Sequence, residues 1–328
     1  MSSPSFRLQV CGFHQFALAA IALTLPCAAA QAQYTTIDPP GSTYNIAFGV
    51  SNGVIVGYQN YGATGFTFDG TSYSTFNVPG ALSTQFYGIS GSNLFGNYVD
   101  SGANGHGFVY DGGSVTTIPD FPGSTPYSTV VDTGQGKVVG GSYFDSLGNI
   151  DGFTYDTTSQ LFTSIIDPNT IGDPNPSTIV SGINGAATVG TYGLTSGNYG
   201  FMESHGVYST ITDPLGIGYT TVNGGLGAYV VGQYVDGSNN YHGYLYDSYT
   251  NTYTTLDDPA AGSHLGTNVY GIGYNPAGGI TVVGAYWDSS NIAHPFEMTY
   301  TPEPGTVGLL VGFGLSGVGI AFRRRRKS

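Results

Sequence analysis

The sequence predicts an all-β protein, a six-bladed β-propeller of four-stranded blades between two terminal segments. Gly accounts for 53 of the 328 residues, Tyr for 26 and Phe for 18, whereas charged residues make up only 8%. Aromatic and β-branched residues between glycine-rich turns favour short strands. A disordered chain would be poor in aromatics. The roughly 270 residues between the terminal segments are enough for a large core.

A repeated set of four strand-like elements is the second observation. A Val-Gly element recurs six times, anchored on Gly57, Gly96, Gly140, Gly190, Gly232 and Gly284. A Gly-Phe element follows each, at Phe66, Phe108, Phe153, Phe201, Tyr244 and Phe296. A Tyr-x-Thr-Ile element is centred on Ile37, Phe76, Ile118, Ile165, Ile211 and Leu256. A weaker apolar element, such as Tyr87–Ser90, precedes the Val-Gly element. Four strands in roughly 45 residues match one propeller blade.

The two ends of the repetitive part predict how the ring closes. The part begins with a Thr-Thr-Ile strand at residues 35–37 and ends with a Phe strand at residues 294–300. The last blade therefore lacks its fourth strand, and the first segment has one to spare. Pairing the two would close the ring and remove an exposed sheet edge.

Polar turns separate the Val-Gly and Gly-Phe strands. In four repeats the turn starts with Tyr-x-Asp, at Asp100, Asp145, Asp236 and Asp288. None of these loops has the closely spaced acids of a calcium loop, so we expect turn hydrogen bonds to each carboxylate. Over residues 34–300 the Val-Gly strand, the Gly-Phe element and the aromatic-Asp turn resemble the HAF-type repeats of bacterial extracellular proteins. This resemblance implies a propeller-like fold and no established activity.

The N-terminus, residues 1–32, predicts a secretory signal peptide. Arg7 supplies the positive charge, Phe16–Leu25 forms a short apolar run, and Ala30-Gln31-Ala32 is an A-x-A cleavage site. A buried core helix is the alternative. Both cysteines lie in this segment. The mature chain would therefore have no disulfide, thiolate nucleophile or zinc–sulfur site.

The C-terminus, residues 301–328, has three parts in order. The first is the motif Pro302, Glu303 and Pro304. The second is an apolar run over residues 306–322, whose 17 residues would span about 25 Å as a transmembrane helix, near the ~30 Å of a bilayer core. The third is the basic cluster Arg323, Arg324, Arg325, Arg326 and Lys327. The positive-inside rule places this cluster in the cytoplasm and the rest of the chain outside.

These three parts resemble the PEP-CTERM sorting signal of bacteria that make exopolysaccharide. The resemblance implies that an exosortase-type membrane protease recognises residues 302–304 and processes the tail. The protein would be exported, anchored by its helix, and then released to the cell surface or beyond. A plain membrane anchor is the alternative.

The charge distribution excludes nucleic acid as a partner. Residues 33–300 hold nineteen acidic residues and one basic residue, Lys137, so the net charge of this span is −18 with histidine neutral. Such a surface has no cationic patch to displace the counterions of a phosphate backbone.

Few residues suggest chemistry. His106, His242 and His294 share one repeat position, and convergence on a metal is one interpretation. Turn residues on separate blades are the interpretation we favour. Glu203 and Glu297 lie outside the recurrent turns, but nothing pairs them as a glycosidase requires. We therefore assign no catalytic residue, no metal ligand and no cofactor.

The sequence predicts a non-catalytic cell-surface or matrix protein associated with exopolysaccharide. Two alternatives stay open, namely a secreted hydrolase acting on polysaccharide and a purely structural surface protein without a ligand. An enzyme should gather its acids at one mouth of the ring, whereas a structural protein should spread them over the turns.

Overall fold

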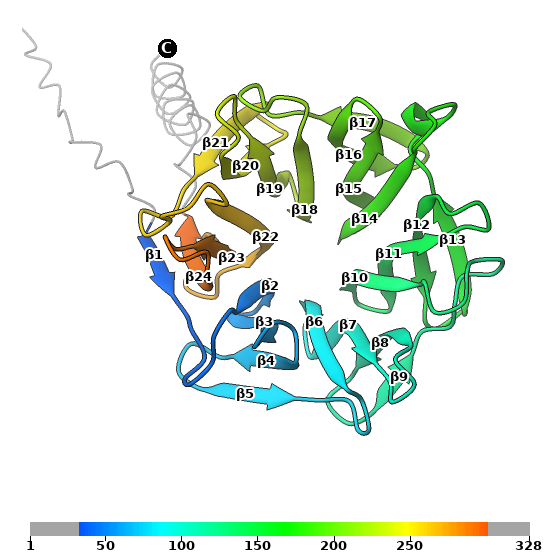
Figure 1. The fold of residues 1–328 in the computed structure, drawn as a ribbon, viewed down its shortest axis with the longest axis horizontal. Coiled ribbons are helices and arrows are strands. Elements are labelled where there is room, and N and C mark those ends of the chain that lie inside the picture. The colour runs from blue at the N-terminus through cyan, green and yellow to red at the C-terminus, as the bar shows by residue number, and fades with distance from the viewer. Residues whose placement is uncertain (1–32, 301–328) are drawn as a thin grey trace, which may run out of the picture. The chain divides into compact units, whose positions relative to one another are not determined.

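The computed structural model describes residues 33–300, which form 24 β-strands and one 3-10 turn, η1 (Pro168–Thr170), arranged as a ring of sheets (Figure 1). The all-β propeller prediction is confirmed. The predicted signal peptide and the sorting tail, with its motif, helix and basic cluster, lie outside the described residues. Within residues 33–300 no helix is long and apolar enough to cross a bilayer.

We group the strands into six repeat units of four, numbered along the chain. Unit 1 contains β2 (Ile46–Ser51), β3 (Val54–Gln59), β4 (Thr64–Phe68) and β5 (Tyr73–Phe76). Unit 2 contains β6 (Ser83–Ser90), β7 (Asn93–Val99), β8 (Gly105–Tyr110) and β9 (Val115–Thr117). Unit 5 contains β18 (Thr220–Leu226), β19 (Tyr229–Val235), β20 (Tyr241–Asp247) and β21 (Thr252–Leu256). Each of these units is a separate antiparallel sheet.

Units 3 and 4 share one sheet of eight strands. Unit 3 contains β10 (Val130–Gln135), β11 (Val138–Phe144), β12 (Ile150–Asp156) and β13 (Leu161–Ile165). Unit 4 contains β14 (Ser177–Asn184), β15 (Ala187–Leu194), β16 (Gly197–Ser204) and β17 (Val207–Ile211). A single parallel pair, Ile150 with Ser177, joins β12 to β14. The prediction of six separate blades is therefore wrong. This contact continues the ladder from unit 3 into unit 4, so these two units form one sheet. The other four units each form a separate sheet of four strands.

Unit 6 is built from both ends of the described chain. It contains β22 (Thr267–Tyr274), β23 (Ile280–Trp287), β24 (Ala293–Tyr300) and β1 (Gln33–Thr36). β1 lies antiparallel to β24, with Thr35 opposite Glu297. The predicted closure of the ring by the N-terminal strand is confirmed.

The weak fourth element of each repeat is the innermost strand (Figure 1). The inner strands are β2, β6, β10, β14, β18 and β22, and each has one register shift against the next strand of its unit. The shift marks a β-bulge, in which one residue is left unpaired and bends the strand.

The anchor glycines lie opposite these bulges. A Cβ on Gly57 would overlap the carbonyl oxygen of Ile46, and a Cβ on Gly96 would overlap that of Gln85. Only glycine fits such a close backbone approach. In the third repeat the position belongs to Gly141, which pairs with Phe153, so the prediction of Gly140 is wrong by one residue.

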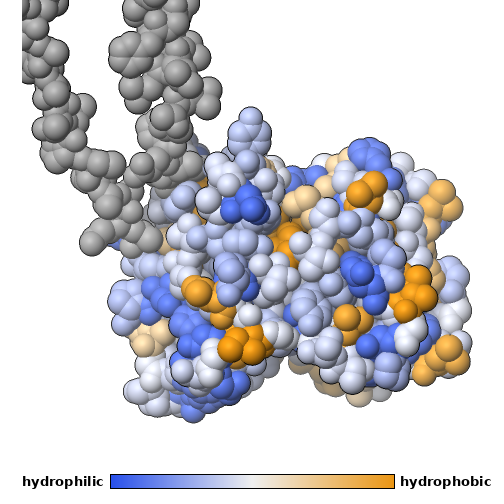
Figure 2. All heavy atoms as spheres, turned by 90° about the horizontal axis from the view of Figure 1, so that it is seen from above, coloured by the Kyte–Doolittle hydropathy of each residue, from blue (hydrophilic) through white to orange (hydrophobic). Residues whose placement is uncertain are grey.

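The core lies between neighbouring sheets. The six aromatic residues of the Gly-Phe elements are fully buried, and each pairs with an anchor glycine on the adjacent strand. Burying each contributes about 1.5–3 kcal/mol. On the side of the molecule in Figure 2, hydrophobic side chains appear as separate spots on a mainly polar surface.

Candidate functional site

The turn carboxylates serve the turns themselves. Asp236 Oδ1 accepts hydrogen bonds from the backbone N–H groups of Ser238 and Asn240, both at 2.8 Å. The backbone bond from Asn240 is the largest influence on this carboxyl and holds its pKa at about 2. Equivalent bonds form at Asp100, Asp145 and Asp288. The predicted turn hydrogen bonds are confirmed.

Each of the three histidines pairs with the carboxylate of its own turn, and two of them also pair with a second carboxylate. His106 Nε2 lies 3.1 Å from Asp100. His242 lies between Asp257, at 2.9 Å, and Asp236, at 3.4 Å. Burial alone would lower the pKa of His242, but the bonds and charges of these two carboxylates outweigh burial and raise it.

His294 repeats the second arrangement, 2.7 Å from Asp38 and 3.5 Å from Asp288. Its pKa is likewise raised by the two carboxylates against the effect of burial. Among residues 33–300 no three His, Cys, Asp or Glu side chains are placed to share a metal ion. The structure therefore does not bring the three histidines together.

Neither glutamate that lies outside the turns faces the ring axis. Glu203 accepts a hydrogen bond from the N–H of Gly206 at 2.7 Å and one from the hydroxyl of Thr188 at 3.0 Å. Glu297 lies on β24 opposite Thr35, and burial raises its pKa. Neither residue lines the cavity described below.

Sequence reasoning missed three buried carboxylates at the junctions between units. Asp167, Asp213 and Asp258 are at most 5% exposed, and each precedes a proline. Each backbone N–H donates to a threonine hydroxyl at or near the start of the next inner strand. Burial raises the pKa of all three carboxyls. The Asp-Pro pair that recurs after the Tyr-x-Thr-Ile element is the sequence signal that could have revealed these carboxylates.

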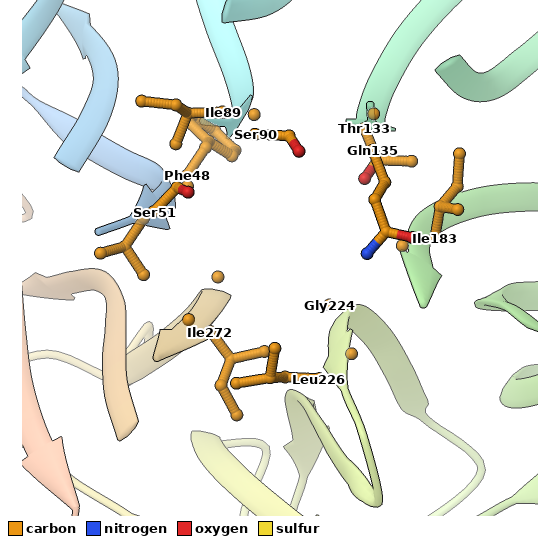
Figure 3. Close-up of a pocket in the computed structure, with 18 of the residues that line it drawn as sticks. Phe48, Ser51, Ile89, Ser90, Thr133, Gln135, Ile183, Gly224, Leu226 and Ile272 are labelled. Carbon is orange, nitrogen blue, oxygen red and sulfur yellow. The ribbon is translucent and has the colours of Figure 1, made fainter. Parts of the chain in front are cut away.

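A cavity of about 240 Å³ lies at the ring axis, where the C-terminal halves of all six inner strands meet. Its wall mixes polar and apolar residues, and its aromatic residues all come from units 6, 1 and 2. Figure 3 shows Phe48, Ile89 and Ile272 with Ser51 and Ser90 on one side, and Thr133 and Gln135 with Ile183 on the other, with Gln135 reaching toward the open centre.

The unpaired bulge residues form a ring at this level. They are Phe48, Tyr87, Asp132, Ser181, Asn223 and Tyr270. The three aromatic members come from units 6, 1 and 2, which are consecutive. The ring centroid of Phe48 lies 4.7 Å from that of Tyr87 and 4.7 Å from that of Tyr270. These three side chains therefore form a continuous aromatic arc.

Asp132 is the charged member of this ring. It is half-buried, and burial raises the pKa of its carboxyl to about 7. Burial also raises the pKa of Tyr87, and the nearby charge of Asp132 adds to this increase. No periodic signal in the sequence marks Asp132, because the other units hold aromatic or neutral residues at the same position.

A belt of hydrogen bonds surrounds the mouth of the cavity. Side chains near the ends of four inner strands accept from the N–H of a turn glycine in the next unit. The pairs are Ser51 with Gly91, Ser90 with Gly136, Gln135 with Gly185, and Asn184 with Gly227. The last residues of β18 and β22 are instead Leu226 and Tyr274. The belt therefore spans units 1 to 5.

Comparison with known families identifies the tail. Residues 301–326 match the PEP-CTERM protein-sorting motif. The chain therefore carries this sorting motif, which implies an exported and sorted surface protein on a propeller scaffold. The HAF-type assignment of the repeats stays a prediction. No curated protein matches the chain in sequence.

Solved structures of similar fold include lectins and an enzyme. SapL1 lectin in complex with alpha methyl fucoside is 13% identical, with a TM-score of 0.47 over 80% of this chain and 97% of that chain. A mutant of Aleuria aurantia lectin with alpha-methyl-L-fucoside is 12% identical, with a TM-score of 0.48 over 80% and 95%. Trypanosoma rangeli sialidase is 9% identical, with a TM-score of 0.48 over 82% and 56%. No ligand or activity is carried over from them.

Proposed function

We propose that this protein is a non-catalytic surface or matrix protein. An exosortase-type protease processes its tail, and the released domain associates with exopolysaccharide. The match of residues 301–326 to the sorting motif carries this proposal. The turn acids support the non-catalytic assignment, because they recur in units 2, 3, 5 and 6 and are bound by turn N–H groups.

Processing is tested in cells that make exopolysaccharide, with and without the protease. We expect the wild-type chain to lose its tail and to reach the surface or the medium. A variant with Pro302, Glu303 and Pro304 all replaced by Ala should keep the tail and stay with the membrane. Glu297→Gln, which changes a carboxylate outside the motif, is the matched control. Equal processing of the triple variant and the wild type would contradict the sorting role.

Association is tested with the processed protein and purified exopolysaccharide of the same cells. We expect the protein to sediment with the polymer, with and without calcium, and the polymer chain length to stay unchanged. If the protein instead stays in the supernatant and the polymer is unaltered, only the alternative of a purely structural protein remains.

Asp132 is the observation that favours the alternative of a hydrolase. A carboxyl with a pKa of about 7 is suited to general acid catalysis near neutral pH. A glycosidase needs a second carboxylate at a fixed separation, and within residues 33–300 the cavity lining contains no carboxylate. Shortening of the polymer by the wild type, and its loss in Asp132→Asn, would establish the hydrolase instead.

A further inference from the structure

The axial cavity combines two surfaces that suit one class of ligand. A pyranose ring has C–H groups on its faces and hydroxyl groups around its edge. Stacking of an aromatic ring on the C–H face together with hydrogen bonds to the hydroxyls therefore binds a sugar specifically. The cavity has an aromatic arc on one side, and on the other it has hydroxyl and amide groups beside the aliphatic residues Ile183 and Leu226.

The apolar side is formed by the arc of Phe48, Tyr87 and Tyr270. All three rings line the cavity and are half-buried. The hydroxyl of Tyr87 donates to Gln85 Oε1 at 2.8 Å, which holds this ring in place. The arc is therefore a preformed stacking surface, and little conformational entropy is lost when a ligand binds.

The polar groups opposite the arc come from units 3 to 5. Gln135 Oε1 accepts from the N–H of Gly185 at 2.8 Å, which leaves its two amide hydrogens to donate. Asn223 donates through Nδ2 to the carbonyl of Val269 at 2.7 Å, which leaves its Oδ1 to accept. Thr133 and Ser181 add hydroxyl groups that can donate or accept. These groups match the mixed donors and acceptors of sugar hydroxyls.

Size and charge narrow the ligand further. A cavity of about 240 Å³ is smaller than the ~300–1,000 Å³ that drug-sized ligands occupy, so it holds a single ring. No cationic side chain lines the cavity. Asp132 does not line it either, but it lies on the wall strand β10 next to Thr133, which does. The span of residues 33–300 carries a net charge of −18. An acidic sugar would be repelled.

We propose that the axial cavity binds one uncharged sugar ring, stacked on the aromatic arc and hydrogen-bonded by units 3 to 5. This site deepens the proposed function and rests on it, because it supplies the contact with exopolysaccharide. A single ring in such a site binds weakly, with a Kd on the order of a millimolar.

The repeat itself supplies a variant that narrows the cavity. Ser181 holds the bulge position of β14, and the same position is Tyr87 in β6 and Tyr270 in β22. Ser181→Tyr therefore adds to the opposite wall a ring that the fold accepts at the equivalent position of two other units, and it removes the Ser181 hydroxyl and narrows the cavity. Ser209→Tyr makes the same change at an exposed position on β17, the outermost strand of the same unit, and is the matched control.

The full-length protein is titrated with the methyl glycosides of glucose, galactose and mannose, and with glucuronate, by saturation-transfer NMR and calorimetry. We expect saturable binding of at least one uncharged glycoside and at least tenfold weaker binding of glucuronate. Ser181→Tyr should abolish binding, with an unchanged thermal unfolding midpoint, and Ser209→Tyr should leave binding as in the wild type. Gln135→Glu, which keeps the acceptor for Gly185, should weaken binding at least fivefold.

Three outcomes would overturn the site. They are no saturable binding of any uncharged glycoside, unchanged binding by Ser181→Tyr, and equal binding of glucuronate. If the wild type still sediments with exopolysaccharide in any of these cases, the proposed function stands and only the axial assignment fails. If Ser181→Tyr abolishes glycoside binding but the wild type does not sediment with the polymer, the site stands and its role in the proposed function fails.

Discussion

Units 6 and 2 contain the same elements but are assembled in different ways. Gly284 pairs with Phe296 in unit 6, and Gly96 pairs with Phe108 in unit 2, and both aromatic rings are fully buried. In unit 2 the outermost strand, β9, follows β8 through a short turn. In unit 6 the outermost strand is β1, from the opposite end of the described chain.

Two further contacts distinguish the closing unit. His294 of β24 bonds to Asp38, just after β1, whereas His106 has only the turn carboxylate Asp100. The hydrogen-bond belt around the cavity mouth also stops before unit 6, because β18 of unit 5 ends at Leu226, which packs against a hydrophobic cluster. Unit 2 is thus held by local connections, whereas unit 6 depends on contacts between distant segments, whose closure costs chain entropy.

The largest expected effect falls equally on both units. Gly284→Ala and Gly96→Ala should each destabilise the fold by at least about 4 kcal/mol, because the new Cβ overlaps a bulge carbonyl oxygen. Chemical unfolding or yield of soluble protein measures this loss. Gly113→Ala is the control, since its Cβ would meet only Asp111, at an ordinary 3.7 Å. A mild effect at either anchor would show that the inner strands can relax.

A proline in each outermost strand separates the two units. Thr35 of β1 and Thr116 of β9 hold equivalent places, two residues before the N–H groups that bond to Pro295 and Gly107. Thr116→Pro should cost about 1–2 kcal/mol, as expected for a lost ladder bond. Thr35→Pro should cost at least about 3 kcal/mol, because detaching β1 exposes the edge of β24 and uncovers buried apolar surface.

Urea unfolding of both proline variants provides the measurement. Equal losses would mean that ring closure adds no stability beyond that of an ordinary outer strand. A larger loss in Thr116→Pro than in Thr35→Pro would reverse the comparison between the two units.

The smallest expected effect depends on pH. The raised pKa of His294 means that the folded state holds the imidazole proton more tightly than the unfolded state. The stabilisation is therefore fully present below the unfolded pKa of about 6.5 and is lost as pH rises through the folded value. His294→Gln should lower stability by about 0.5–1 kcal/mol more at pH 5.5 than at pH 9.

Asp38→Asn should reduce the pH dependence seen at His294. The measurement is the urea midpoint of each variant across this pH range. If the difference in urea midpoint between the wild type and His294→Gln does not change with pH, the contact of His294 at the ring closure is not a charged one.

Several features were predicted from local patterns alone. Strand content, the repeat of four elements and the turn bonds of Asp236 follow from residue type and spacing, because each depends on neighbours within a few residues. Gly141 was missed because two glycines stand side by side and only the pairing with Phe153 distinguishes them. The joining of units 3 and 4 was missed because one parallel pair, Ile150 with Ser177, leaves no trace in composition.

The sequence by itself determined the β-class, the order of the strands, the closure by β1 and the sorting motif of the tail. Only the tertiary structure decided which side chains meet at the axis. Phe48 and Tyr270 lie at opposite ends of the repetitive part, and they come into contact only because the ring closes. The partial burial that raises the pKa of Asp132 has the same origin, since it arises only when the inner strands of neighbouring units come together.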